Sequence, residues 1–179
     1  APMDSVVSPE TAIAIGKLGG LGVLNLEGLW TRYDDPRIPL GEIASMPDKH
    51  ATKRMQEIYA APIRPELIKE RIQQIRDAGV TVAASLSPAR TAEFHKAVIA
   101  AGVDIFVIRG TTVSAEHVAA ENEALNLKKF IYELDVPVIV GGVATSTAAL
   151  HLMRAGAAGV LVGFGGGATH TTRKVLGVE

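Results

Sequence analysis

The segment from Val162 to Arg173 places closely spaced glycines beside hydroxyl, imidazole and guanidinium side chains. It reads Val-Gly-Phe-Gly-Gly-Gly-Ala-Thr-His-Thr-Thr-Arg and follows an apolar run directly. The glycines of Gly163–Gly167 let backbone N–H groups approach an anion, because no Cβ stands in the way. The threonines and Arg173 could add contacts to phosphate or ribose. The segment therefore predicts a phosphate-binding loop, and a flexible loop without a ligand is the alternative.

The same segment differs from the two best-known phosphate motifs. A dinucleotide fingerprint has a helix directly after its third glycine, near the start of a βαβ unit. A P-loop has a lysine followed by serine or threonine, and this segment has neither feature. The glycines alone thus indicate an anion and not a particular cofactor.

Two other apolar runs end in residues that could meet a ligand. Arg109 follows Ile108 and could contact an anion, or it could be solvated or paired with a carboxylate. Gly141-Gly142 would permit either close approach of a ligand or tight packing. The five histidines lack zinc-ligand spacing. Among them His117, which follows a threonine-rich loop, is a candidate for acid–base chemistry, although a role outside catalysis is expected.

A helix that ends at glycine and is followed by an apolar run recurs along the chain, and the candidate residues come after these runs. Such runs are typical of parallel strands that are buried on both faces. The predicted strands are a short piece at Ala1–Met3 and five longer runs, Leu21–Leu26, Val80–Leu86, Val103–Ile108, Val136–Val140 and Ala157–Val162.

The predicted helices begin and end with clear signals. Ser8-Pro9 and Ser87-Pro88 each place a capping hydroxyl before a proline that suits the first helical position. Glycine after each helix supplies a left-handed C-terminal cap. The predicted helices are Ser8–Leu18, Glu66–Ala78, Thr91–Ala101 and Ser146–Ala155.

Alternation of strands and helices predicts a parallel α/β protein. We expect a (β/α)8 barrel that is incomplete, with about strands 1 to 6, because a closed barrel needs eight strands. An open, six-stranded doubly wound sheet is the alternative. Residues 1–179 are predicted to form one barrel domain, and the first residue, Ala1, suggests a fragment of a longer protein. Residues 29–65, with five prolines and a short helix near Thr52–Tyr59, would be a decorated connection, an active-site lid or a subunit contact.

The composition excludes several classes of partner. Apolar residues make up 47% of the chain and charged residues 21%, and the net charge is −1. A broad basic surface for nucleic acid or anionic lipid is therefore not expected. The absence of cysteine excludes disulfides, thiolate metal sites and thiol nucleophiles. Without an apolar run of membrane-spanning length, we predict a soluble, cytoplasmic protein.

Four motifs together resemble IMP dehydrogenases and GMP reductases. They are Ala1-Pro2-Met3-Asp4, Leu18-Gly19-Gly20-Leu21-Gly22, Val140–Thr145 and Gly163–Arg173. The chain is most similar to the IMP dehydrogenase-related branch, which has no CBS domains. The resemblance implies a barrel that acts on a purine nucleoside monophosphate with NAD or NADP, a place in GMP biosynthesis, and a homo-oligomer, namely a tetramer.

The resemblance also implies roles for individual residues. Met3 would lie against the purine, and Thr172 would take the position of the catalytic-loop threonine. Carbonyls of Gly165, Gly167 and His170 correspond to the family's monovalent-cation positions and imply a K+ site. The residues implied around the substrate are Met3, Gly142, Gly165, Gly166, Gly167 and Ala168.

Four positions depart from the family pattern. His170 stands where the family has the cysteine that attacks the purine C2, and Ala168 stands where it has a serine. Arg109 replaces an aspartate that meets the cofactor, and Gly142 replaces an asparagine near the purine. Histidine can act as a nucleophile, but its shape differs from that of a thiolate. The substitutions therefore predict an oxidoreductase whose activity is altered or lost.

Two other functions are compatible with the same residues. One is a non-catalytic regulatory protein that binds a purine nucleotide through the glycine loop. The other is an FMN-dependent barrel similar to nitronate monooxygenases. These enzymes have an Ala-Pro-Met start and a Gly-Gly-Leu-Gly strand that resemble those of this chain. Yellow colour on purification would favour the latter.

A segment of a barrel leaves unpaired parallel strand edges. We therefore expect residues 1–179, when expressed alone, to be insoluble or to lack fixed tertiary packing. Circular dichroism during heating tests this expectation, and a sharp, cooperative melt of the segment would contradict it.

Overall fold

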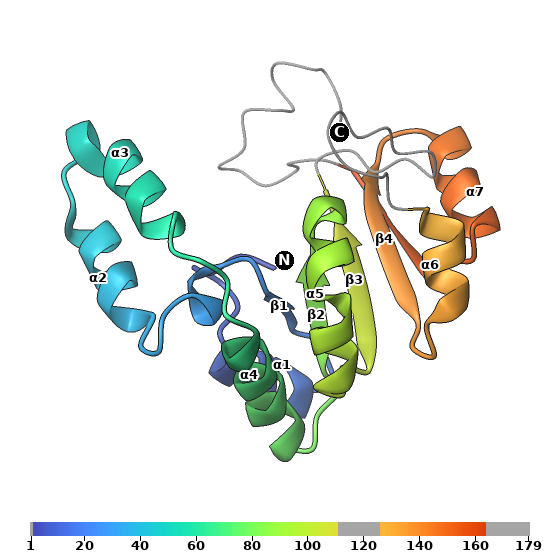
Figure 1. Cartoon of the computed structure of the whole chain (residues 1–179), viewed down its shortest axis with the longest axis horizontal. Coiled ribbons are helices and arrows are strands. Elements are labelled where there is room, and N and C mark those ends of the chain that lie inside the picture. The colour runs from blue at the N-terminus through green and yellow to red at the C-terminus, as the bar shows by residue number, and fades with distance from the viewer. Residues whose placement is uncertain (1, 111–125, 164–179) are drawn as a thin grey trace. The chain divides into compact units, whose positions relative to one another are not determined.

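The computed structural model describes residues 2–110 and 126–163 (Figure 1). The chain forms two compact units. The N-terminal unit comprises Ala1–Leu86 and Phe94–Asp104, and the C-terminal unit comprises Ser87–Glu93 and Ile105–Glu179. Helix α5 (Pro88–Ala100) contributes residues to both units.

In the N-terminal unit two strands pair in parallel and helices α1 and α4 pack together. Strand β1 lies beside β2, with Val23 opposite Ala83 and Asn25 opposite Ser85. Leu24, Ile68 and Ile72 are fully buried in its core. The elements are α1 (Pro9–Lys17), β1 (Val23–Asn25), the 3-10 helix η1 (Leu29–Thr31), α2 (Arg37–Ser45), α3 (Asp48–Tyr59), α4 (Pro65–Asp77) and β2 (Ala83–Leu86).

Local signals explain where these helices begin and end. Ser8 caps α1 through its side chain, which accepts the N–H of Thr11, and the Thr11 hydroxyl accepts the N–H of Ser8 in return. Gly19 and Gly79 have φ angles of +82° and +71°, which an L side chain rarely adopts. The predicted caps at these positions are confirmed.

In the C-terminal unit three parallel strands lie in chain order, β3-β4-β5. Phe106 of β3 packs edge-to-face on Phe130 of α6, with ring centroids 5.8 Å apart. Both rings are buried, and this pair fixes α6 against the strands. The elements are β3 (Ile105–Arg109), α6 (Leu127–Glu133), β4 (Val138–Val143), α7 (Ser146–Arg154) and β5 (Gly159–Val162).

The five longer strands and the helices that we predicted are present, although each of these strands begins later than predicted. The short strand predicted at Ala1–Met3 is wrong, since residues 2 and 3 lie in no strand. The connection at 29–65 contains more helix than the single piece near Thr52–Tyr59 that we expected. Pro36 precedes α2 and Pro39 lies in its first turn, where a proline removes no intrahelical hydrogen bond. Neither proline therefore interrupts the helix. Helix α6 was not predicted, because it has only seven residues.

Arg71 connects α4 to the backbone that follows β1. Its side chain is only 10% exposed, and Nε donates to the Trp30 carbonyl at 3.1 Å. Nη2 donates to the Asp34 carbonyl at 2.7 Å, and Nη1 pairs with Glu70 at 2.7 Å. One guanidinium thus satisfies two carbonyls of an irregular segment, which no lysine could do with the same fork geometry.

We predict that Arg71→Met destabilises the protein by about 3 kcal/mol, because charged hydrogen bonds to partly buried carbonyls are lost. Urea unfolding of the full-length protein measures this loss. Arg54→Met is the control, since Arg54 pairs with Glu42 and Glu57 on the exposed surface and should change stability little. Equal shifts of the two midpoints would contradict the prediction.

Candidate functional site

The strand ends of the C-terminal unit bring several predicted residues together. Arg109 is paired with Gly141 across β3 and β4. The N–H of Gly110 donates to the Gly141 carbonyl at 2.8 Å, and the N–H of Gly142 donates to the Gly110 carbonyl at 3.0 Å. The N–H of Gly163 donates to the Val143 carbonyl at 2.7 Å. These three amides are occupied by protein carbonyls and do not provide donors for an anion.

Arg109 and Gly142 differ in what they offer a ligand. Arg109 ends β3 and is exposed, so its guanidinium is accessible to an anion. Gly142 is buried and lies at the register shift between Gly141 and Val143 in β4. A Cβ on Gly141 would lie 2.6 Å from the Leu161 carbonyl oxygen and 2.5 Å from the Leu161 Cβ. Tight packing between β4 and β5 therefore accounts for the glycine at 141.

Met3 precedes Asp4, a carboxylate that accepts two hydrogen bonds from distant segments of the N-terminal unit. Met3 is exposed, and its carbonyl accepts the N–H groups of Val6 at 3.0 Å and Val7 at 2.8 Å. Asp4 Oδ2 accepts the N–H of Leu29 at 2.9 Å and the hydroxyl of Tyr59 at 2.6 Å. The turn that carries Met3 is thus held to the segment after β1 and to the end of α3.

The second oxygen of Asp4 packs against glycine. Asp4 Oδ1 is buried and has no hydrogen-bond partner among the described residues. A Cβ built on Gly28 would lie 1.7 Å from that oxygen. Any larger residue at position 28 would displace the carboxylate, so Gly28 is required for space and not for its φ angle, which is −86°.

The phenol of Tyr59 is suited to donate to this carboxylate. Burial raises the pKa of Tyr59, and the hydrogen bond to Asp4 raises that pKa further. The hydroxyl therefore stays protonated through the neutral range, and the contact weakens only under strongly alkaline conditions. No local pattern predicts this contact, because Tyr59 lies 55 residues from Asp4 along the chain.

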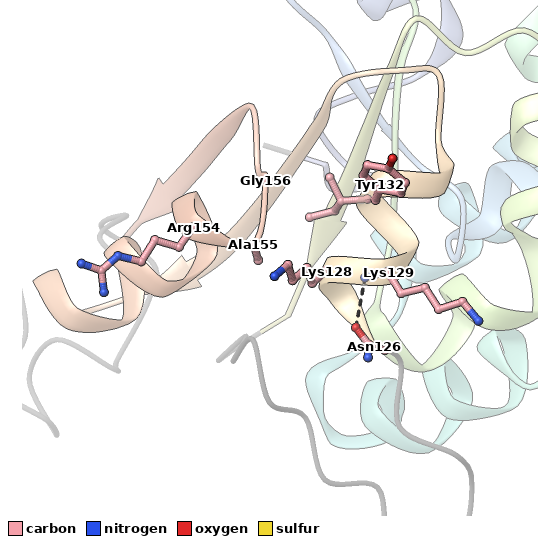
Figure 2. A pocket seen from close by; sticks show the side chains of 8 residues that line it. Asn126, Lys128, Lys129, Tyr132, Arg154, Ala155 and Gly156 are labelled. Atoms are coloured by element: carbon pink, nitrogen blue, oxygen red, sulfur yellow. Dashed lines mark hydrogen bonds between the residues drawn. The ribbon is translucent and has the colours of Figure 1, made fainter.

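A pocket of about 660 Å³ lies between α6 and α7 (Figure 2). It carries three cationic side chains, but those of Lys129 and Arg154 extend away from it in Figure 2, and Lys128 alone leans toward Ala155. The cationic groups are spread apart, and we assign no ligand to this pocket. Its lining residues are Asn126, Lys128, Lys129, Ile131, Tyr132, Arg154, Ala155 and Gly156.

Several predicted site residues lie outside the described residues. They are His117, Gly165, Gly166, Gly167, Ala168, His170 and Thr172. Within residues 2–110 and 126–163, no cluster of three His, Asp or Glu side chains could hold a metal ion. None of the helices described there combines the length and the apolar character that a membrane crossing requires.

Comparison with known proteins decides the family. A sequence model of the IMP dehydrogenase / GMP reductase domain matches residues 1–179. The chain belongs to the IMP dehydrogenase/GMP reductase family. An "uncharacterized oxidoreductase" of Mycobacterium tuberculosis (H37Rv) is 50% identical, over 99% of this chain and 49% of the relative. The inosine-5'-monophosphate dehydrogenase of Cryptosporidium parvum is 25% identical, over 98% of this chain and 44% of the relative.

A solved structure agrees with this membership. The IMP dehydrogenase/GMP reductase-like protein of Corynebacterium glutamicum has a TM-score of 0.88 and 47% identity, over 99% of this chain and 47% of that one. The chain thus spans about half the length of the relatives it matches. The (β/α) barrel is confirmed as the fold, present here in part, and the doubly wound alternative is excluded. The names of the relatives support an oxidoreductase.

We predict that Gly141→Ala destabilises the full-length protein by about 1–3 kcal/mol, because the new Cβ overlaps the backbone of β5. Gly159→Ala is the matched control in the neighbouring strand, where a Cβ would lie 3.3 Å from a side-chain carbon of Ile139. Differential scanning calorimetry compares the two melting temperatures. If the melting temperature of Gly141→Ala equals or exceeds that of Gly159→Ala, tight packing between β4 and β5 does not explain the glycine at position 141.

Proposed function

We propose that this chain is part of an oxidoreductase that acts on a purine nucleoside monophosphate with NAD or NADP. The observation that carries the proposal is the match of the IMP dehydrogenase / GMP reductase domain along the entire chain. The inosine-5'-monophosphate dehydrogenase relative, which is aligned over 98% of the chain, supports the same substrate class.

Different residues would contact different parts of the substrate. Met3 would lie against the purine, from a turn held in place through Asp4. Backbone amides of Gly165, Gly166, Gly167 and Ala168 would bind the phosphate, since the amides of Gly110, Gly142 and Gly163 are already occupied. Carbonyls of Gly165, Gly167 and His170 would bind K+. These contacts position the substrate without supplying the redox chemistry.

The nicotinamide cofactor would supply hydride acceptance or donation when bound. Arg109 fits such a cofactor, because it is an exposed cation at a strand end and a dinucleotide carries anionic phosphates. His170 and Thr172 would be the catalytic residues, with His170 in the position of the family's cysteine. An imidazole at this position is the reason to expect altered or low turnover.

Absorbance at 340 nm tests the enzymatic proposal. The full-length protein is incubated with IMP and NAD or NADP, and separately with GMP and NADPH. We predict turnover with one pair, and a fall in kcat of about a hundredfold or more in His170→Ala. Equilibrium binding of the nucleotide should persist in this variant. No absorbance change with any pair would exclude the enzyme.

A second candidate is a non-catalytic protein that binds a purine nucleotide. The observation that favours it is the absence of cysteine from the chain, since the family's chemistry depends on a thiolate. This candidate predicts that a purine monophosphate raises the melting temperature without any turnover. The family match favours both candidates over an FMN-dependent barrel.

A further inference from the structure

Three segments that are distant in sequence meet at the Asp4 carboxylate. The turn Met3–Val7 supplies the carboxylate, the first residue of η1 donates its N–H, and the last residue of α3 donates its hydroxyl. The two donor distances to Oδ2 are 2.9 Å and 2.6 Å. Since Oδ1 faces Gly28, the carboxylate has little freedom to rotate away from these donors.

Helices α2 and α3 form a hairpin, visible in cyan and teal in Figure 1. Arg54 of α3 contacts both carboxylate oxygens of Glu42 in α2, at 2.6 Å and 3.1 Å. A hydrogen bond also holds the end of α3 to the segment after η1, since the hydroxyl of Tyr33 donates to the Ile58 carbonyl at 2.8 Å. Tyr59, the next residue, joins the same helix end to the turn that carries Met3.

We propose that Tyr59 is a positioning residue, which fixes the purine-facing turn at Met3 by holding the carboxylate of Asp4. This inference rests on the proposed function, in which Met3 contacts the purine. Because Met3 is adjacent to Asp4, loss of the phenol hydrogen bond loosens the backbone that presents the Met3 side chain. The α2–α3 hairpin is thereby linked to substrate affinity through Tyr59.

The position of Tyr59 supports a donor role over simple packing. The phenol is partly buried, and both burial and the neighbouring carboxylate raise its pKa, so that it remains a donor at neutral pH. Tyr33, which follows η1, provides a matched comparison, because its hydroxyl contacts the same end of α3 but donates to the Ile58 carbonyl and not to Asp4. Both tyrosines can be changed to phenylalanine with the loss of one oxygen atom each.

Isothermal titration calorimetry on the full-length protein, with IMP and with GMP, tests the inference. We expect Tyr59→Phe to weaken nucleotide binding about tenfold, the effect of one charged hydrogen bond. Tyr33→Phe should leave the affinity unchanged even where it lowers the melting temperature. A merely structural Tyr59 would lower the melting temperature in the same way and leave the dissociation constant unaltered.

Gly28→Ala provides an independent variant, because its Cβ would displace the same carboxylate without altering Tyr59. It should weaken binding to a similar extent, and the double variant with Tyr59→Phe should be no weaker than the single ones. If the wild type binds nucleotide and Tyr59→Phe binds equally well, the positioning role is wrong and the proposed function stands. If the wild type binds neither nucleotide, both are wrong.

Discussion

Parallel pairing of short apolar strands is the constraint on which the rest of this structure depends. In a parallel pair the end of one strand lies beside the end of the next, so residues that follow different strands become neighbours. Arg109, Gly110, Gly141 and Gly142 meet in this way in the C-terminal unit. Asn25 and Ser85 meet at the corresponding ends of β1 and β2 in the N-terminal unit.

Glycines at the strand ends of the C-terminal unit offer only backbone N–H and carbonyl groups to a ligand. A glycine amide can serve a ligand or a neighbouring strand but not both. Gly142 and Gly163 serve neighbouring strands, so their amides are not available to the phosphate of the ligand that we propose. In the N-terminal unit, side chains hold distant segments together instead. Asp4 accepts hydrogen bonds from Leu29 and Tyr59. Arg71 donates hydrogen bonds to the carbonyls of Trp30 and Asp34.

Much of the fold could be predicted because its signals are local. Ser8-Pro9 marks the start of α1, and glycines with positive φ mark the ends of α1 and α4 within a few residues. The contact between Tyr59 and Asp4 could not be predicted, since it spans 55 residues and neither residue type requires the other. Nor can a single sequence indicate whether an amide such as that of Gly163 faces a ligand or another strand. The family was predicted from four short motifs and is confirmed along the whole chain.

The proposed binding of a purine nucleoside monophosphate depends on contacts to the phosphate group of the ligand. Calorimetric titration of the full-length protein with IMP, GMP and the corresponding nucleosides separates the phosphate from the base. We predict that at least one monophosphate binds and that its nucleoside binds at least tenfold more weakly, about 1.4 kcal/mol. Equal binding of nucleotide and nucleoside, or no binding of either nucleotide, would contradict the account.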